Sequence, residues 1–597
     1  MNVKKGAELI AEFLVKEEVP YVFGICGHGN VGMLDALYDV QSDIRLISPR
    51  HEQTAGHMAD AYFRVKHEPV ATLTSCGPGS ANMVMPTALA MTDSSAFLAI
   101  TANVPTSQFN RGPFQEINRH NQADFPNVLR PVVKRSFQPS RVDMLPLALR
   151  QSMKTMLSDR PGPVQLDVPF NVFQEEAEIQ LEHGPKHTHN AQRSGATSSD
   201  IAKIVDMLEA ATQPVLFIGH GVALSKAESV LAEFARYLDI PVISSPNGMG
   251  CLDMTDPLSL GFIGRNGAYQ ANQAGRMADL VIAVGARFDD RSSSSWMKGY
   301  SWNFPETQLV HVDIDPAEVG RNYVPDAAVV ADARTVLTQL LAEAHSRGLG
   351  SEGRLAPWRA RIDAWAQEWD AFVGPGFVEH RQPIRPERIV ADCQNVLPHD
   401  AIVTFDAGIH HNWFMQFWKA RNPRTMLNSW GFSGMGFGPS AVLGAKLAAP
   451  DKVCVSVSGD GGFTMVPHVL CTAVEYNIPV VWVVWNNFSW GAIRDIQYGV
   501  FSGREIGTAF YAGDNSQPYN PDFAAWARAS GVDAVTVTRS EDFAGALEHA
   551  VKANKPFLID VHVDADIRPP ATGAWALPPV PHKEPVFGER YLATPSA

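Results

Sequence analysis

Short apolar runs alternate with longer amphipathic segments along most of the chain. Near the start, "YVFGICG", "IRLISP" and "PVATLT" are typical of buried strands. "KGAELIAEFLVKEEV" and "EQTAGHMADAYFRV" instead carry their apolar residues at helical spacing, which predicts helices with one buried face. The same alternation returns twice further along the chain, as in "ADLVIAVGARFDD" and "IPVVWVVWNN". Strands that alternate with helices predict parallel sheets covered by helices on both faces.

The chain has 597 residues, which is more than a single core normally contains. Polar stretches such as "EHGPKHTHNAQRSGATSSD" interrupt the alternation and read as linkers. The fold class we predict is α/β, with three doubly wound parallel-sheet domains. The expected boundaries are a first domain at 1–181, a linker at 182–200, a central domain at 201–345, a linker at 346–382, a third domain at 383–564 and a Pro-rich tail at 565–597.

Composition narrows the possible partners. The formal net charge is −14 and no basic block occurs, so we expect no nucleic-acid partner. No apolar run has the length of a membrane span, and the N-terminus reads as a charged amphipathic helix rather than a signal peptide. The six cysteines are scattered, which favours buried thiols in a reducing compartment. The expected location is the cytoplasm.

The stretch "SGDGGF" at 458–463 places one carboxylate among glycines after an apolar run. Glycines between a strand and a helix let main-chain amides approach a phosphate closely. Asp460 would repel that phosphate unless a cation lay between them, and Mg²⁺ suits one carboxylate combined with phosphate oxygens. Asn487 follows the next apolar run, 27 residues later, and the turn near Ser489 offers a main-chain carbonyl. The alternative is a glycine turn in which Asp460 only caps a helix.

This pair of stretches resembles the diphosphate motif of the thiamine-diphosphate-dependent enzymes, which begins with Gly-Asp-Gly and ends with Asn-Asn at this spacing. The resemblance implies that Asp460, Asn487 and the main chain of Ser489 bind the Mg²⁺ that bridges the diphosphate. Cofactor contacts are expected in the same turn, from Gly459, Gly461 and Gly462.

"SPRHEQTAGHMADAYFRV" is similar to the helix of this family that carries a catalytic glutamate. Alone, Glu52 would be only an acidic residue that suits the start of a helix. By resemblance, Glu52 hydrogen-bonds the aminopyrimidine of the cofactor and so activates its thiazolium carbon. Its presence argues against glyoxylate carboligase, a relative that lacks this carboxylate.

Two further stretches resemble cofactor-binding segments of the family. "GFSGMGFGPSAVLGA" implies that Met435 forces the cofactor into its folded shape and that the Ser433 carbonyl holds its amino group. The alternative for Met435 is core filling. "FDAGIHHNW" implies that His410 and His411 donate hydrogen bonds to the diphosphate. A histidine metal site is the weaker interpretation of that pair.

Within this family, the chain resembles the large subunit of acetohydroxyacid (acetolactate) synthase, through stretches such as "SCGPGSAN", "RPGPVQLDVP" and "GARFDDR" along nearly the whole chain. This resemblance implies that Gln115 in "FQE" faces the cofactor near the reacting carbon. The resemblance implies a homodimer or homotetramer in which the Glu52 domain of one chain faces the Asp460 domain of another.

Two departures from the synthase pattern affect the substrate side. "FGICGHGN" places His28 where the synthases have no histidine. Some related lyases and diketone hydrolases look similar to this chain at that turn. "FSWGAIRDIQ" follows Asn487, and we expect Trp490 and Ile493 to line the acceptor pocket.

The predicted reaction is decarboxylation of a pyruvate-like 2-oxo acid and transfer of the resulting enamine to a carbonyl acceptor. The first alternative is a C–C lyase or diketone hydrolase in which the enamine is protonated, with His28 as the donor. The second is a nucleotide-binding protein without catalysis.

The central domain carries a separate set of candidate residues. "GARFDDR" and "HVDIDPAEVGRN" resemble the flavin-binding stretches of the biosynthetic synthases. Arg287 could pair with a diphosphate, and Asp313 or Asp315 could accept hydrogen bonds from a ribose or adenine. We expect FAD without a redox role, and ADP at the same site is the alternative.

Overall fold

The computed structural model describes residues 3–116, 125–181, 193–350, 353–514 and 517–573. Parts of the predicted first linker and of the C-terminal tail therefore lie outside the described residues. Within the described part, the strands form three six-stranded sheets, and every strand pair within these sheets is parallel. The predicted fold class, three doubly wound α/β domains, is confirmed.

The first sheet has the strand order β3-β2-β4-β5-β7-β6. Helices α1, α2, α7 and α8 pack on one face, and α3 and α5 pack on the other. The strands are β2 (Tyr21–Gly24), β3 (Arg45–Ile47), β4 (Ala71–Thr74), β5 (Leu98–Asn103), β6 (Ser136–Phe137) and β7 (Val164–Pro169). The helices are α1 (Gly6–Lys16), α2 (Val31–Asp39), α3 (Glu52–Lys66), α4 (Pro78–Ala81), α5 (Val84–Thr92), α6 (Phe125–Leu129), α7 (Leu145–Leu157) and α8 (Phe170–Gln174). A small antiparallel pair, β1 (Val3–Lys5) with β8 (Glu176–Glu178), joins the two ends of this region.

The central sheet has the order β11-β10-β9-β12-β13-β14. Helices α9, α10, α11 and α13 contribute to the core on one face, and α12 and α14 to that on the other. The strands are β9 (Pro214–Ile218), β10 (Val242–Ser244), β11 (Ser259–Phe262), β12 (Leu280–Val284), β13 (Gln308–Asp313) and β14 (Ala327–Val330). The helices are α9 (Ser198–Ala210), α10 (His220–Leu224), α11 (Glu228–Leu238), α12 (Tyr269–Met277), α13 (Ala333–Ser346) and α14 (Ala356–Val378).

The third sheet has the order β16-β15-β17-β18-β20-β19. Its strands are β15 (Ile402–Phe405), β16 (Met426–Asn428), β17 (Cys454–Gly459), β18 (Val481–Asn486), β19 (Asp533–Val537) and β20 (Phe557–His562). The helices are α15 (Pro386–Val396), α16 (Ile409–Phe417), α17 (Phe437–Ala448), α18 (Asp460–Met465), α19 (Val469–Tyr476), α20 (Gly491–Val500), α21 (Phe523–Ala529) and α22 (Ser540–Ala553). Central strands β17 and β18 are almost wholly buried, as expected for a parallel sheet covered on both faces.

Helix α3 differs from the expected helix with one buried face. Every residue from Thr54 to Arg64 is buried, including polar ones. The reason is that α3 lies between its own sheet and α17 of the third domain. The Thr54 hydroxyl hydrogen-bonds Ser440 of α17 at 3.2 Å, and the His57 ring packs edge-on against Phe437. A polar stripe that would usually face water therefore joins two domains here.

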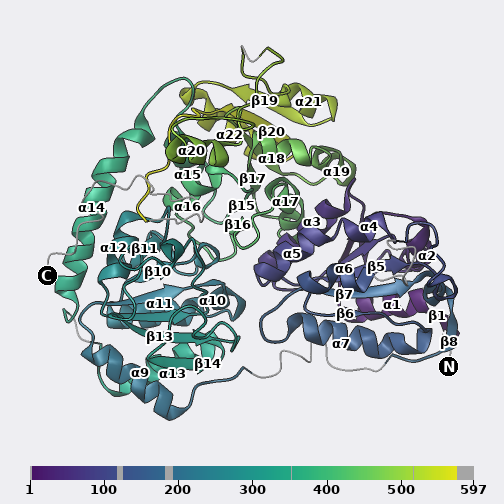
Figure 1. Ribbon diagram of the computed structural model, residues 1–597, viewed down its shortest axis with the longest axis horizontal. Coiled ribbons are helices and arrows are strands. Elements are labelled where there is room, and N and C mark those ends of the chain that lie inside the picture. The colour runs from purple at the N-terminus through teal and green to yellow at the C-terminus, as the bar shows by residue number, and fades with distance from the viewer. Residues whose placement is uncertain (1–2, 117–124, 182–192, 351–352, 515–516, 574–597) are drawn as a thin grey trace.

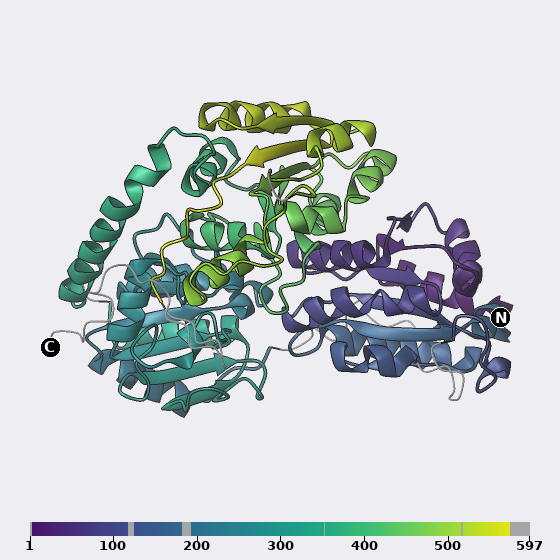
Figure 2. The same ribbon diagram turned by 45° about the horizontal axis from the view of Figure 1, so that its top comes forward.

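Figure 1 shows the first domain at the right, the central domain at the lower left and the third domain at the top, with α14 along the left edge. The turned view in Figure 2 keeps the first domain beside the third, where α3 packs against α17. Within the described part of the chain, none of the helices combines the length and the apolar character that crossing a membrane requires.

Candidate functional site

The two stretches that the sequence singles out meet at the carboxyl ends of neighbouring strands. In the parallel register of β17 and β18, Gly459 lies opposite Trp485, so the turns that follow the two strands are adjacent. Asp460 is 1% exposed, and its Oδ1 accepts the main-chain N–H of Gly461 at 2.8 Å. The main-chain amides of Phe488 and Ser489 also lie close to this carboxylate. Asp460 is the first residue of α18, and Gly459 holds the cap position, so the alternative of Asp460 as the helix N-cap does not apply.

Asn487 and Ser489 are buried beside Asp460, in a turn with the left-handed φ of +54° at Phe488. The Ser489 hydroxyl is buried without a hydrogen-bond partner among the described residues. Burial raises the pKa of Asp460 to about 6, although hydrogen bonds from Asn520 and the nearby amides counter that shift. One buried carboxylate surrounded by neutral oxygens is a donor set that fits Mg²⁺ and phosphate oxygens.

The glycines of this turn leave room on one side only. A Cβ at Gly461 would lie 2.2 Å from the Trp490 ring, and one at Gly462 would lie 2.2 Å from Asp406 Oδ2. At Gly459 a Cβ would meet only the His410 ring, at the ordinary contact distance of 3.5 Å. The turn is therefore closed by protein at two glycines and more open beside the third.

The two predicted histidine donors point to different places. His410 lies beside Gly459, and its Nε2 is buried without a partner among the described residues. Burial lowers the pKa of His410 to about 4, so the ring is neutral near pH 7. His411 instead packs edge-on against Trp430 at 5.3 Å, and burial lowers its pKa as well. The structure thus places His410, but not His411, beside the glycine turn.

The loop that carries Ser433 and Met435 is held from two sides. Asp406 accepts the amide of Gly436 at 3.0 Å, and Ser433 adopts a left-handed φ of +57°. The Gln53 side chain of α3 donates to the Met435 carbonyl at 3.3 Å. The residue next to Glu52 therefore contacts the predicted cofactor-binding loop of the third domain.

A second cluster belongs to the first domain alone. The Asn82 side chain donates to Glu52 Oε2 at 2.9 Å, and Glu52 Oε1 lies near Gly79. This contact fixes the glutamate at the start of α3, above the turn that follows β4.

The other predicted residues of the first domain surround a thiol. Cys76 Sγ lies 3.6 Å from His28 Nε2 and 3.6 Å from Gln115 Oε1. Burial raises the pKa of Cys76, so the thiol is protonated and donates to the Gln115 carbonyl oxygen. The His28 ring also lies 5.8 Å from that of Phe114, which is 79% exposed. The structure thus brings His28 and Gln115 together through Cys76.

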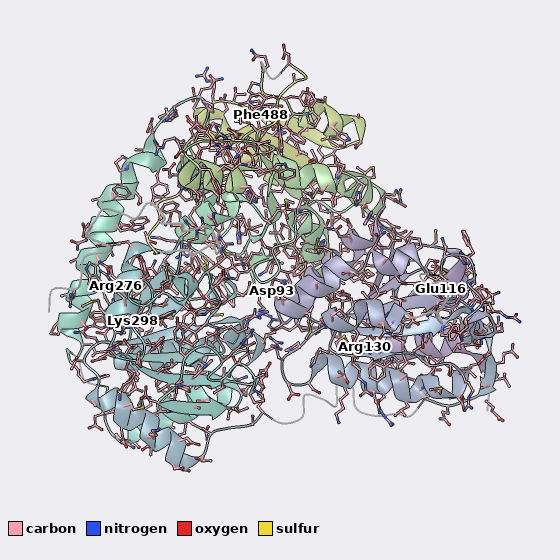
Figure 3. All side chains as sticks on the ribbon, viewed as in Figure 1. Asp93, Glu116, Arg130, Arg276, Lys298 and Phe488 are labelled. Atoms are coloured by element: carbon pink, nitrogen blue, oxygen red, sulfur yellow. The ribbon has the colours of Figure 1, made fainter. Side chains whose placement is uncertain are left out.

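A cavity of about 580 Å³ lies where the three domains meet. Its walls include Arg287 and Asp313 of the central domain and Trp430 of the third. Asp93 of the first domain, labelled at the centre of Figure 3, also lines it and lies 3.9 Å from the Arg287 guanidinium. Burial raises the pKa of Asp313 to about 6. Asp315, the third predicted residue, pairs with Arg160 at 3.4 Å and is not in the cavity wall.

Four side chains in or beside these sites were not predicted as site residues, namely Asn82, Asp93, Asp406 and Asn520. Asn82 and Asp406 lie within the stretches "SCGPGSAN" and "FDAGIHHNW", so the motifs could have pointed to them. Asp93 and Asn520 lie outside the quoted motifs, and only their contacts identify them.

Comparison with known proteins agrees with this arrangement. Three family models match, described as thiamine pyrophosphate enzyme N-terminal TPP binding domain (4–124), central domain (201–340) and C-terminal TPP binding domain (406–561). The chain belongs to the thiamine pyrophosphate enzyme family, and the predicted resemblance is confirmed. It is a thiamine-diphosphate-dependent enzyme that makes or breaks carbon–carbon bonds.

Several similar proteins are acetolactate synthase large subunits. The probable acetolactate synthase large subunit of Methanocaldococcus jannaschii is 33% identical over 586 residues, which is 97% of this chain and 93% of that protein. The isozyme 3 large subunit of Escherichia coli is 32% identical and covers 94% of this chain and 96% of its own length. The acetolactate synthase large subunit of Corynebacterium glutamicum is 32% identical over 94% of this chain and 87% of that protein.

Proposed function

We propose that this enzyme decarboxylates a pyruvate-like 2-oxo acid and joins the remaining fragment to a second carbonyl compound, as the names of its relatives describe for them. One observation carries the proposal. Asp460 and the turn at 487–489 meet at the ends of β17 and β18, beside an open glycine turn. Similarity to acetolactate synthases over 94–97% of the chain supports the same reaction class.

The roles of the residues follow from their positions. When bound, thiamine diphosphate would supply a carbon acid that is a nucleophile once deprotonated, together with a cationic ring that can take up the electron pair released by decarboxylation. Asp460, Asn487 and the Ser489 main chain would hold Mg²⁺, with Gly459, Gly461, Gly462 and His410 around the diphosphate. Glu52, fixed by Asn82, would hold a proton at the aminopyrimidine.

Two features support an assembly of at least two chains. The family resemblance implies that the Glu52 domain of one chain faces the Asp460 domain of another, and the similar proteins are named as large subunits. We propose that Glu52 of one chain completes the site that holds Asp460 of another, in a homodimer or homotetramer.

The test of the proposed reaction is product identification. Pure enzyme with thiamine diphosphate, Mg²⁺ and pyruvate is expected to release CO₂ and to form a 2-hydroxy-3-oxo acid, observed by mass spectrometry. A second carbonyl compound should divert part of the product to a mixed adduct. Absence of any coupled product, with only an aldehyde or an acid released, would reject the carboligase in favour of the lyase or hydrolase alternative.

His28 is the observation that favours this alternative, because its imidazole lies in the first-domain cluster with Gln115. There it would act on substrate, as a proton donor. We expect His28→Ala to lower turnover by about 10²-fold, within the usual range for general acid–base groups, while proton exchange at C2 of the bound cofactor stays normal. Turnover of the variant should be measured alongside C2 exchange. Slowed exchange, or unchanged turnover, would remove His28 from the substrate side.

We further propose that the cavity between the domains binds FAD, with Arg287 on its diphosphate and Asp313 on a ribose hydroxyl. ADP is the alternative ligand, because it offers the same two groups. Decarboxylation and transfer need no electron acceptor, so the flavin would have a structural role.

Purified protein is therefore expected to be yellow and to keep its oxidised flavin spectrum through anaerobic turnover. Arg287→Ala should weaken flavin binding by about 10-fold or more, because it removes a charge-assisted contact with the diphosphate. Flavin fluorescence titration measures this affinity. A colourless enzyme that is fully active with thiamine diphosphate and Mg²⁺ alone would exclude flavin as a required component.

A further inference from the structure

The turn that carries Asn487 and Ser489 is covered by a later part of the chain. The Trp490 amide donates to the Thr508 carbonyl at 2.7 Å, and the Phe510 amide donates to the Phe488 carbonyl at 2.8 Å. The Tyr519 amide then donates to the Phe510 carbonyl at 3.0 Å, which returns the chain towards the site. These contacts bring the next residue, Asn520, over Asp460.

The Asn520 side chain bridges the two strand ends. Its Nδ2 donates to Asp460 Oδ2 and to Asn486 Oδ1, each at 2.8 Å. A primary amide nitrogen has two hydrogens, so both can be used in this bridge. Asn486 in turn donates to Asp560 Oδ1 of β20 at 3.0 Å. A polar chain therefore runs from β20 through Asn486 and Asn520 to the carboxylate of Asp460.

This geometry constrains the carboxylate without occupying it. Oδ1 of Asp460 accepts the Gly461 amide, and Oδ2 accepts Asn520. Each carboxylate oxygen can accept about two contacts, so both oxygens retain capacity for a cation. Partners of this kind fix the orientation of a metal ligand, and their loss typically weakens metal binding about 10–100-fold.

We propose that Asn520 is a positioning residue of the metal centre, which holds the Asp460 carboxylate and the Asn486 amide in register for Mg²⁺. The inference rests on the proposed function, because Mg²⁺ and thiamine diphosphate are assigned there. It adds a third segment to a site that the motif places in two turns. The first asparagine of "WNN" has a different part in this bridge, since Asn486 accepts from Asn520 and donates to Asp560.

The test measures metal affinity rather than turnover. Mn²⁺ serves as the probe in the presence of saturating thiamine diphosphate, with bound and free ion separated by electron paramagnetic resonance. We expect Asn520→Ala to weaken Mn²⁺ binding about 10–100-fold. Tyr519→Ala is the matched control, because Tyr519 is the exposed neighbour in the same segment and meets Phe510 through its main chain. Its Mn²⁺ affinity should equal that of the wild type.

A second variant keeps the test valid when Asn520→Ala does not fold. Asn520→Leu keeps the branching of the side chain but removes both donors without adding a charge beside Asp460. In that variant too, Mn²⁺ should bind more weakly, and the rise in melting temperature on adding Mg²⁺ and thiamine diphosphate should shrink. Wild-type affinity in a folded Asn520 variant would overturn the inference. Failure of the wild-type protein to bind Mn²⁺ would instead overturn the proposed metal site itself.

Discussion

Glu52→Gln is expected to bind thiamine diphosphate and Mg²⁺ nearly as tightly as the wild type but to exchange the C2 proton of the cofactor far more slowly. A neutral amide can still accept the hydrogen bond from Asn82, so the start of α3 should keep its geometry. It cannot stabilise a protonated pyrimidine, which is the role assigned to the carboxylate. General acid–base groups contribute roughly 10²–10⁴-fold, and a loss of that size is expected in exchange and in turnover.

The measurement is quenched-flow hydrogen–deuterium exchange at C2 of the bound cofactor, followed by NMR of the released cofactor. Glu68→Gln provides the control, because it makes the same chemical change at an exposed residue just beyond the other end of α3. Exchange in the control should match the wild type. Normal exchange in Glu52→Gln would show that another group activates the cofactor.

Strand ends are the part of the site that a sequence can predict well. Alternation of apolar runs and helices locates the parallel strands, and ligands in such folds bind beyond their carboxyl ends. Glycines and one carboxylate at such an end were therefore enough to point to Asp460, and Asn487 followed from the next strand. Both turns lie side by side in the structure because β17 and β18 are neighbours.

Contacts between distant segments could not be predicted in the same way. Asn520 is a single asparagine in a loop, and only the fold places it 2.8 Å from Asp460. Asp93 follows α5 with no motif around it, yet its buried carboxylate accepts the Gly431 amide and pairs with Arg64. Arg64 itself belongs to the polar stripe of α3, which periodicity alone assigns to solvent. Such side chains are identified by their partners, and those partners are far away in the sequence.

Asp460→Ala is expected to abolish cofactor retention. Asp460 is the only charged side chain in the proposed ligand set, and it is almost fully buried, so water cannot easily replace it. Loss of an outer partner of a metal ligand costs about 10–100-fold in affinity, and loss of the charged ligand itself should cost more. Isothermal titration with thiamine diphosphate and Mg²⁺ measures this loss. Asp451→Ala, which removes an exposed carboxylate of the same domain, should titrate like the wild type.

The same variant tests how many chains build one site. Asp460→Ala and Glu52→Gln are each expected to be inactive alone. If Glu52 of one chain serves Asp460 of another, a mixed dimer has one site with both native residues and one with neither. Random mixing of equal amounts then restores about a quarter of the wild-type activity, since half of the dimers are mixed and half of their sites are intact. Subunit exchange is verified with differently tagged chains. Mixed dimers that form but stay inactive would mean that Glu52 and Asp460 act within one chain, whereas wild-type cofactor affinity in Asp460→Ala would remove the carboxylate from the metal site.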